Sequence, residues 1–198
     1  EGLAVADGKL YVANSGGYCM PAYENTLSVI DLADFRRRTT LPVAVNMQHI
    51  VVDTRGMLWV SATGNYADVA PSLCRVDPRS GQSTTFPIPV GSMTLQGDSL
   101  YIVSNEWDFT LNHGVPASAI VNVERGEIVS RQLVDADILA QTVPYGIAVH
   151  PRTHEIFISD AGDYVSPGTL YCFQRDGQLA WKVRTGQIPG HLLMVGQQ

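Results

Sequence analysis

Four stretches of the sequence place amide or carboxylate side chains close to an aromatic residue, and each stretch follows a short apolar run. Aromatic rings beside convergent polar groups suit sugar or peptide ligands, because the ring supplies flat apolar area and the polar groups fix orientation. Alternatively, the aromatic residues recur because each fills the gap between repeated structural units. The predicted ligand-binding residues are Asn14, Tyr18, Asn65, Tyr66, Asn105, Glu106, Trp107, Tyr145, Asp160, Asp163 and Tyr164.

The same stretches contain oxygen donors of the kind that bind calcium. Glu106 and Asp160 are the alternative metal ligands in this interpretation. His49 and His191 could each serve as a catalytic base, or be structural histidines held by hydrogen bonds. The sequence has no G-x-S-x-G and no H-E-x-x-H motif, so nothing else in it indicates nucleophilic or zinc-dependent catalysis.

The elements that would position these residues are short runs rich in β-branched and aromatic residues, bounded by Gly, Pro, Asp or Asn. Four such runs in a row predict a four-stranded antiparallel meander, and this order of runs occurs four times. The second run of each unit is KLYVAN, MLWVSA, SLYIVS and EIFISD, starting at Lys9, Met57, Ser99 and Glu155. These starts lie 48, 42 and 56 residues apart, near the spacing of propeller blades. The composition predicts an all-β fold, with one helical turn at most, at residues 135–140.

We therefore predict a β-propeller of four-stranded antiparallel blades, which forms a single, partial domain over residues 1–198. One such unit buries too little alone, so the units must stack face to face. The loops after the second strands should emerge at the same end as the starts of the first strands, where Asn46, Gln48, His49, Tyr145 and His191 lie. The expected blades span residues 2–43, 45–88, 90–140 and 143–190, followed by a closing strand at residues 191–195.

The charge balance excludes one class of partner. With 13 basic and 19 acidic residues, the chain has a net charge of −6 and no extended basic face for nucleic acid or anionic lipid. No run approaches the roughly 20 apolar residues of a membrane helix. The three cysteines have no zinc-binding or CxxC spacing.

The segments KLYVANSGG, LSVIDL and PYGIAVHPRTHEIFISDAGDYVSPGTLYCF resemble YVTN/NHL-repeat propellers of the YncE-like group. They are especially similar to the cell-envelope members described as surface-layer proteins. The resemblance implies a seven-bladed ring, of which this chain is the C-terminal part, closed by missing N-terminal blades or by a partner chain. It also implies export to the periplasm or outer cell surface, with a lipid anchor upstream. It supplies no catalytic residues.

Together these features favour an exported propeller scaffold that binds a protein or glycan at its loop-rich face, without defined catalysis or a cofactor. The alternative is a lactonase- or lyase-like hydrolase that uses His49 or His191, with or without Ca²⁺ held by Glu106 and Asp160. Propeller lactonases hold such an ion over the central channel. A third interpretation is a purely structural envelope repeat.

Overall fold

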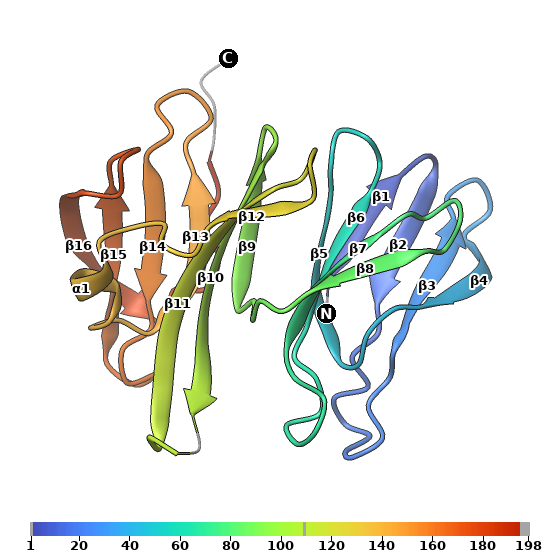
Figure 1. Cartoon of the computed structure of the whole chain (residues 1–198), viewed down its shortest axis with the longest axis horizontal. Coiled ribbons are helices and arrows are strands. Elements are labelled where there is room, and N and C mark those ends of the chain that lie inside the picture. Colours follow the sequence, from blue (N-terminus) through green and yellow to red (C-terminus); the bar gives the residue numbers. More distant parts are fainter. Residues whose placement is uncertain (1, 109, 195–198) are drawn as a thin grey trace. The chain divides into compact units, whose positions relative to one another are not determined.

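A computed structural model of the chain describes residues 2–108 and 110–194. The chain divides into two compact units, Glu1–Val90 and Gly91–Gln198. Each unit contains two four-stranded antiparallel sheets in which the strands follow one another in chain order (Figure 1). The predicted fold class, an all-β chain built from four such sheets, is confirmed.

Unit 1 contains strands β1 to β8. Its first sheet is β1 (Leu3–Ala6), β2 (Lys9–Ala13), β3 (Thr26–Asp31) and β4 (Arg36–Pro42). Its second sheet is β5 (Met47–Val52), β6 (Leu58–Ala62), β7 (Ser72–Val76) and β8 (Ser83–Phe86).

Unit 2 contains strands β9 to β16 and one helical turn. Its first sheet is β9 (Ser92–Gln96), β10 (Ser99–Asp108), β11 (His113–Asn122) and β12 (Glu127–Ser130). The second is β13 (Pro144–Val149), β14 (Ile156–Asp160), β15 (Pro167–Phe173) and β16 (Leu179–Gln187). The helix α1 (Ala136–Leu139) begins after Asp135, whose carboxylate accepts hydrogen bonds from the backbone N–H groups of Asp137 and Ile138. Within the described residues no helix has the length and apolar character needed to span a membrane.

The core of unit 1 lies between its two sheets. Alternate residues of β2 and β3 point toward β5, because successive side chains of a strand face opposite sides of the sheet. Gly2, next to β1, permits the close approach of the two sheets, since a Cβ there would lie 2.8 Å from the backbone oxygen of Gln48. The fully buried side chains of this core include Ala13, Leu27, Met47, Leu58 and Val60.

Unit 2 has an equivalent core between β10 and the sheet that begins with β13. Val103 of β10 packs in one cluster with Ile147, Ile158 and Phe173, and Leu139 of α1 joins the same cluster. The repeated arrangement in both units follows from the repeated pattern of apolar residues.

A buried carboxylate holds the turn between β5 and β6. Asp53 Oδ1 accepts hydrogen bonds from the backbone N–H of Arg55 (2.9 Å) and of Met57 (3.0 Å). Its Oδ2 accepts one from Trp59 Nε1 at 3.0 Å, and the Trp59 ring is fully buried. Asp53 therefore fixes both the turn and the orientation of the indole.

One sequence prediction needs correction. Asn105, Glu106 and Trp107 were expected in a loop, but β10 continues to Asp108 because it pairs residue by residue with an equally long β11. Residues 191–194 of the proposed closing strand at residues 191–195 form no strand with the rest of the described chain, but the strand was expected to pair with blades outside this chain, so it stays a prediction. Val195 lies outside the described residues.

Candidate binding face

In unit 1 the loop after β2 (residues 14–25), the loop after β6 (residues 63–71) and the segment leading into β5 lie together. Asn46 connects all three, since its N–H donates to Glu24 O (2.8 Å) and its own carbonyl accepts from Thr63 N (3.0 Å). The N–H of Gly64 donates to Val45 O at 3.2 Å. The prediction that second-strand loops gather where a first strand begins is confirmed in this unit (Figure 1).

Tyr66 is presented by a tight turn in this loop. Asn65 Oδ1 accepts hydrogen bonds from Ala67 N (3.1 Å) and Val69 N (2.8 Å), which closes the turn around it. Tyr66 has a φ of 57°, its side chain is 64% exposed, and its ring stands edge-on to Tyr23 with centroids 6.0 Å apart. An aromatic pair of an exposed Tyr66 and a half-buried Tyr23 thus lies at this end of unit 1.

Tyr164 is presented in the same way in unit 2. Asp163 Oδ1 accepts from Val165 N (2.9 Å) and Ser166 N (2.6 Å), and Ser166 Oγ donates to Asp163 Oδ2 at 2.8 Å. Tyr164 has a φ of 61°, is 48% exposed and stands edge-on to Tyr145 at 5.9 Å. We call the segments Asn65–Tyr66 and Asp163–Tyr164 the tyrosine turns.

The tyrosine turns carry a conformational cost. A bulky residue in the left-handed region costs roughly 1–2 kcal/mol relative to glycine, which adopts it freely. Phe35 and Ile188 also combine a positive φ with an exposed side chain, so this cost alone does not distinguish the tyrosine turns. Their distinguishing feature is that each turn holds an exposed tyrosine edge-on to a second tyrosine.

The carboxylate of Asp163 makes the second tyrosine turn sensitive to acid. Hydrogen bonds from the Ser166 and Val165 N–H groups lower the pKa of Asp163 from 3.8 to about 2. The folded chain therefore binds fewer protons here than the unfolded chain, so this stabilisation is complete above pH about 4 and is lost as the pH falls through about 2.

We expect the amide protons of Val165 and Ser166 to lose protection from hydrogen exchange as the pH falls through about 2. In Asp163→Asn the amide oxygen accepts the same bonds without titrating, so this acid transition should disappear. Val69, whose N–H is bonded to Asn65, is the internal control. Equal loss of protection at Val69 and Val165 would show global unfolding instead.

The other predicted ligand-binding residues differ in placement. Tyr18 is fully exposed in the loop after β2. Asn14 donates from Nδ2 to Thr26 Oγ1 (3.2 Å) and Ser28 Oγ (3.0 Å), so its amide ties β2 to β3. In unit 2 Trp107 is exposed near the end of β10, and Asn105 Oδ1 is buried with no hydrogen-bond partner among the described residues.

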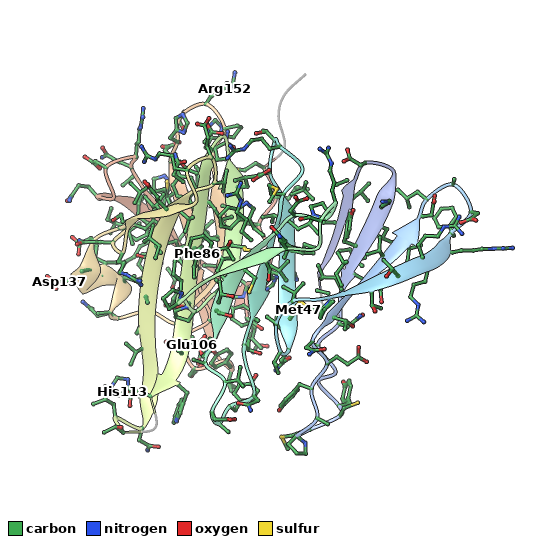
Figure 2. The ribbon with its side chains drawn as sticks, turned by 45° about the vertical axis from the view of Figure 1, so that its right-hand side comes forward. Met47, Phe86, Glu106, His113, Asp137 and Arg152 are labelled. Atoms are coloured by element: carbon green, nitrogen blue, oxygen red, sulfur yellow. The ribbon has the colours of Figure 1, made fainter. Side chains whose placement is uncertain are left out.

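Glu106 lies on β10, close to the hairpin end marked by His113, while Arg152 lies at the opposite end of unit 2 (Figure 2). Its side chain is half-buried, and this burial raises the pKa of the Glu106 carboxyl.

The two candidate bases lie in different parts of the chain. His49 is an exposed residue of β5 whose backbone N–H donates to Ser61 Oγ at 2.8 Å, and His191 is exposed beyond β16. They belong to different units.

Tyr23 is a candidate binding residue that the predicted ligand-binding set left out. Its counterpart Tyr145 is the second residue of β13, in the same sheet as the loop of Tyr164. Tyr23, in contrast, lies in the loop after β2, in a different sheet from the loop of Tyr66, so no common spacing identifies it.

The oxygen donors proposed for calcium do not fit a metal site well. Asp160 Oδ1 accepts hydrogen bonds from Val143 N (2.8 Å) and Gly162 N (2.9 Å), and the carboxylate of Asp163 is engaged by its own turn. Over residues 2–108 and 110–194, no three His, Cys, Asp or Glu side chains come together as a metal-holding group. These oxygens stabilise the loops.

Comparison with known proteins identifies the fold of the chain but no family. No family model and no curated protein matches the sequence. Among solved structures, the chain is similar to Kuenenia stuttgartiensis hydrazine synthase, with a TM-score of 0.71 and 13% identity over 93% of this chain and 49% of that one. The Neurospora crassa Pan2 WD40 domain matches with a TM-score of 0.61 and 10% identity over 89% of this chain and 50% of that one. The chain has the β-propeller fold.

A third similar structure is KlAtg21 in complex with the coiled coil of AgAtg16, with a TM-score of 0.62 and 13% identity over 92% of this chain and 55% of that one. The chain spans about half the length of these propeller structures. Identities this low show the fold alone.

Proposed function

We propose that this chain is part of a propeller scaffold that binds a partner through the loops carrying the tyrosine turns. The observation that carries the proposal is that each turn holds an exposed tyrosine edge-on to a second tyrosine, Tyr66 to Tyr23 and Tyr164 to Tyr145. Tyrosine is enriched at the energetic centres of interfaces, since it offers a large rigid area and a polar hydroxyl.

A protein partner is supported by the use of the same fold in KlAtg21, whose structure contains a bound coiled coil. A glycan is the second candidate ligand, favoured by the exposed aromatic rings beside the polar side chains of Asn65 and Asp68. The resemblance to YVTN/NHL-repeat propellers of the YncE-like surface-layer group supports export to the cell envelope as part of the proposal. The remaining blades of the ring would come from upstream sequence or from a partner chain.

The test uses the variants Tyr66→Gly and Tyr164→Gly in a binding screen on a printed glycan array and on a displayed peptide library. Glycine relieves roughly 1–2 kcal/mol of backbone strain, while losing the tyrosine pair costs about 0.5–1.5 kcal/mol. Stability should therefore change by less than about 1 kcal/mol, while binding of any ligand selected by the native chain falls at least about tenfold.

The matched control is Phe35→Gly. Phe35 is also an exposed aromatic residue with positive φ (55°), but it lies in the β3–β4 turn, at the opposite end of its sheet from the loop after β2. This variant should keep full binding. If the tyrosine variants bind every selected ligand as tightly as the native chain does, the tyrosine turns are not the recognition surface.

A further inference from the structure

The second sheet of unit 1 contains an arginine without an anionic partner. Arg75 stands in the middle of β7, opposite Trp59 of β6 and Thr84 of β8. Its Nε atom is buried and has no hydrogen-bond acceptor among the described residues. The ion pairs found in the described part of the chain involve Arg38, Arg79 and Arg125, and none involves Arg75.

The guanidinium of Arg75 is held on a rigid platform. Its central carbon lies 5.7 Å from the centroid of the Trp59 ring, a distance that allows cation–π attraction. Trp59 cannot turn away, because its Nε1 donates to the buried carboxylate of Asp53 at 3.0 Å. The platform leaves the buried Nε donor without an acceptor, which is an unfavourable state for a buried polar group.

Arg75 also lines an open pocket of about 410 Å³. Gln82 and Thr84 add an amide and a hydroxyl group on the Arg75 side of the sheet, each able to donate a hydrogen bond, and Met57 supplies an apolar wall. The pocket therefore contains a positively charged group in a fixed position, further hydrogen-bond donors, and an Arg75 Nε–H that has no acceptor among the described residues.

One negative group in the lining decides which anion fits. Asp77 shares the pocket, and its carboxylate accepts from Arg79 N (2.9 Å) and Ser80 Oγ (3.0 Å) in its own turn. For a phosphate dianion both the attraction to Arg75 and the repulsion from Asp77 double, so with Asp77 in the lining the second charge adds little net attraction and hydrogen-bond geometry decides the fit. A planar carboxylate also matches the two parallel N–H groups of a guanidinium edge.

We propose that this pocket, which we call the Arg75 pocket, binds a carboxylate group, paired with the guanidinium of Arg75 and hydrogen-bonded by Thr84. The carboxylate comes from a small carboxylic acid or from an acidic side chain of a partner protein. This site is separate from the tyrosine turns and does not depend on the function proposed for them.

The test is an NMR titration at constant ionic strength, following the Arg75 Nε–H and Trp59 Nε1–H signals. The probes are acetate, glutamate with both termini blocked, and inorganic phosphate at a pH where it is a dianion. We expect saturable shifts with a Kd of roughly 10 mM for the carboxylates and weaker binding of phosphate. Tighter binding of blocked glutamate than of acetate identifies a side-chain ligand, whereas equal binding identifies a small acid.

Two variants of Arg75 and one control variant test whether the carboxylate binds at Arg75. Arg75→Gln should abolish the shift of the Trp59 signal, and Arg75→Lys, which keeps the charge but lacks the guanidinium edge, should weaken binding at least about tenfold. Arg37→Gln removes the same charge from the exposed strand β4 and should leave binding unchanged. Absence of saturation up to roughly 100 mM carboxylate, an equal effect of Arg37→Gln, or tighter binding of phosphate than of carboxylate would overturn the proposal.

Discussion

Replacing Asp53 by alanine should cost about 3 kcal/mol of unfolding free energy, one of the two largest effects that we expect in this chain. Asp53 is buried and accepts three hydrogen bonds, from the backbone N–H groups of Arg55 and Met57 and from the indole of Trp59. Alanine leaves the buried indole N–H without an acceptor and removes the bonds that close the β5–β6 turn. Urea unfolding followed by tryptophan fluorescence measures the loss.

Asp53→Asn separates the contribution of the hydrogen bonds in the β5–β6 turn from that of the hydrogen bond to the Trp59 indole. The amide oxygen still accepts from the turn, but its NH₂ group then faces the Trp59 N–H, donor to donor, so roughly half of the loss should remain. Asp34→Ala is the control, because Asp34 accepts comparable bonds from Arg36 N and Arg38 on an exposed turn. It should cost less than about 1 kcal/mol. Equal losses in Asp53→Ala and Asp34→Ala would mean that burial of Asp53 contributes nothing.

The strand pattern was predictable from the sequence because apolar alternation and turn residues act locally. KLYVAN and EIFISD contain β-branched and aromatic residues at a period of two, and both form second strands. Local preference failed at Asn105–Trp107, since asparagine and glutamate are disfavoured in strands. There the pairing of Trp107 with Gly114 across the hairpin extends the sheet, and such a cross-strand contact has no local signal.

The candidate sites were only partly predictable for the same reason. Asn65–Tyr66 and Asp163–Tyr164 are visible in the sequence as polar residues followed by an aromatic one. Their positive φ angles depend on side-chain hydrogen bonds to residues further along the loop, which sequence spacing does not reveal. In the sequence Arg75 is an ordinary strand residue. Only the structure shows that its Nε–H has no hydrogen-bond acceptor among the described residues.

Gly64→Ala should be the most damaging small substitution in the loop after β6. Gly64 has a φ of +69°, and an added Cβ would clash with the backbone oxygen of Val69. That oxygen also accepts a hydrogen bond from Asn65 N at 3.2 Å, so the loop cannot relieve the clash without opening. We expect a loss of about 3 kcal/mol in unfolding free energy, and loss of hydrogen-exchange protection at the amide of Val69.

Gly8→Ala isolates the steric part of this effect. Gly8 has nearly the same φ, +70°, but no atom lies within 4 Å of the position that its Cβ would occupy. Both alanines bear the same left-handed strain of roughly 1–2 kcal/mol, so the difference between the two variants measures the clash alone. Similar losses in the two variants would show that the loop yields freely around Val69.

The clash in Gly64→Ala should also affect ligand binding at Tyr66. Asn65 Oδ1 accepts from Val69 N, so a loop that opens at Val69 also releases the turn that presents Tyr66. Tyr66 then loses its edge-on contact with Tyr23, although neither tyrosine is altered. Gly64→Ala should therefore reduce ligand binding as strongly as Tyr66→Gly does, whereas Gly8→Ala, in the β1–β2 turn, should leave it unchanged. Because Tyr66→Gly preserves stability and Gly64→Ala does not, the pair distinguishes loss of a contact from loss of the turn that positions it.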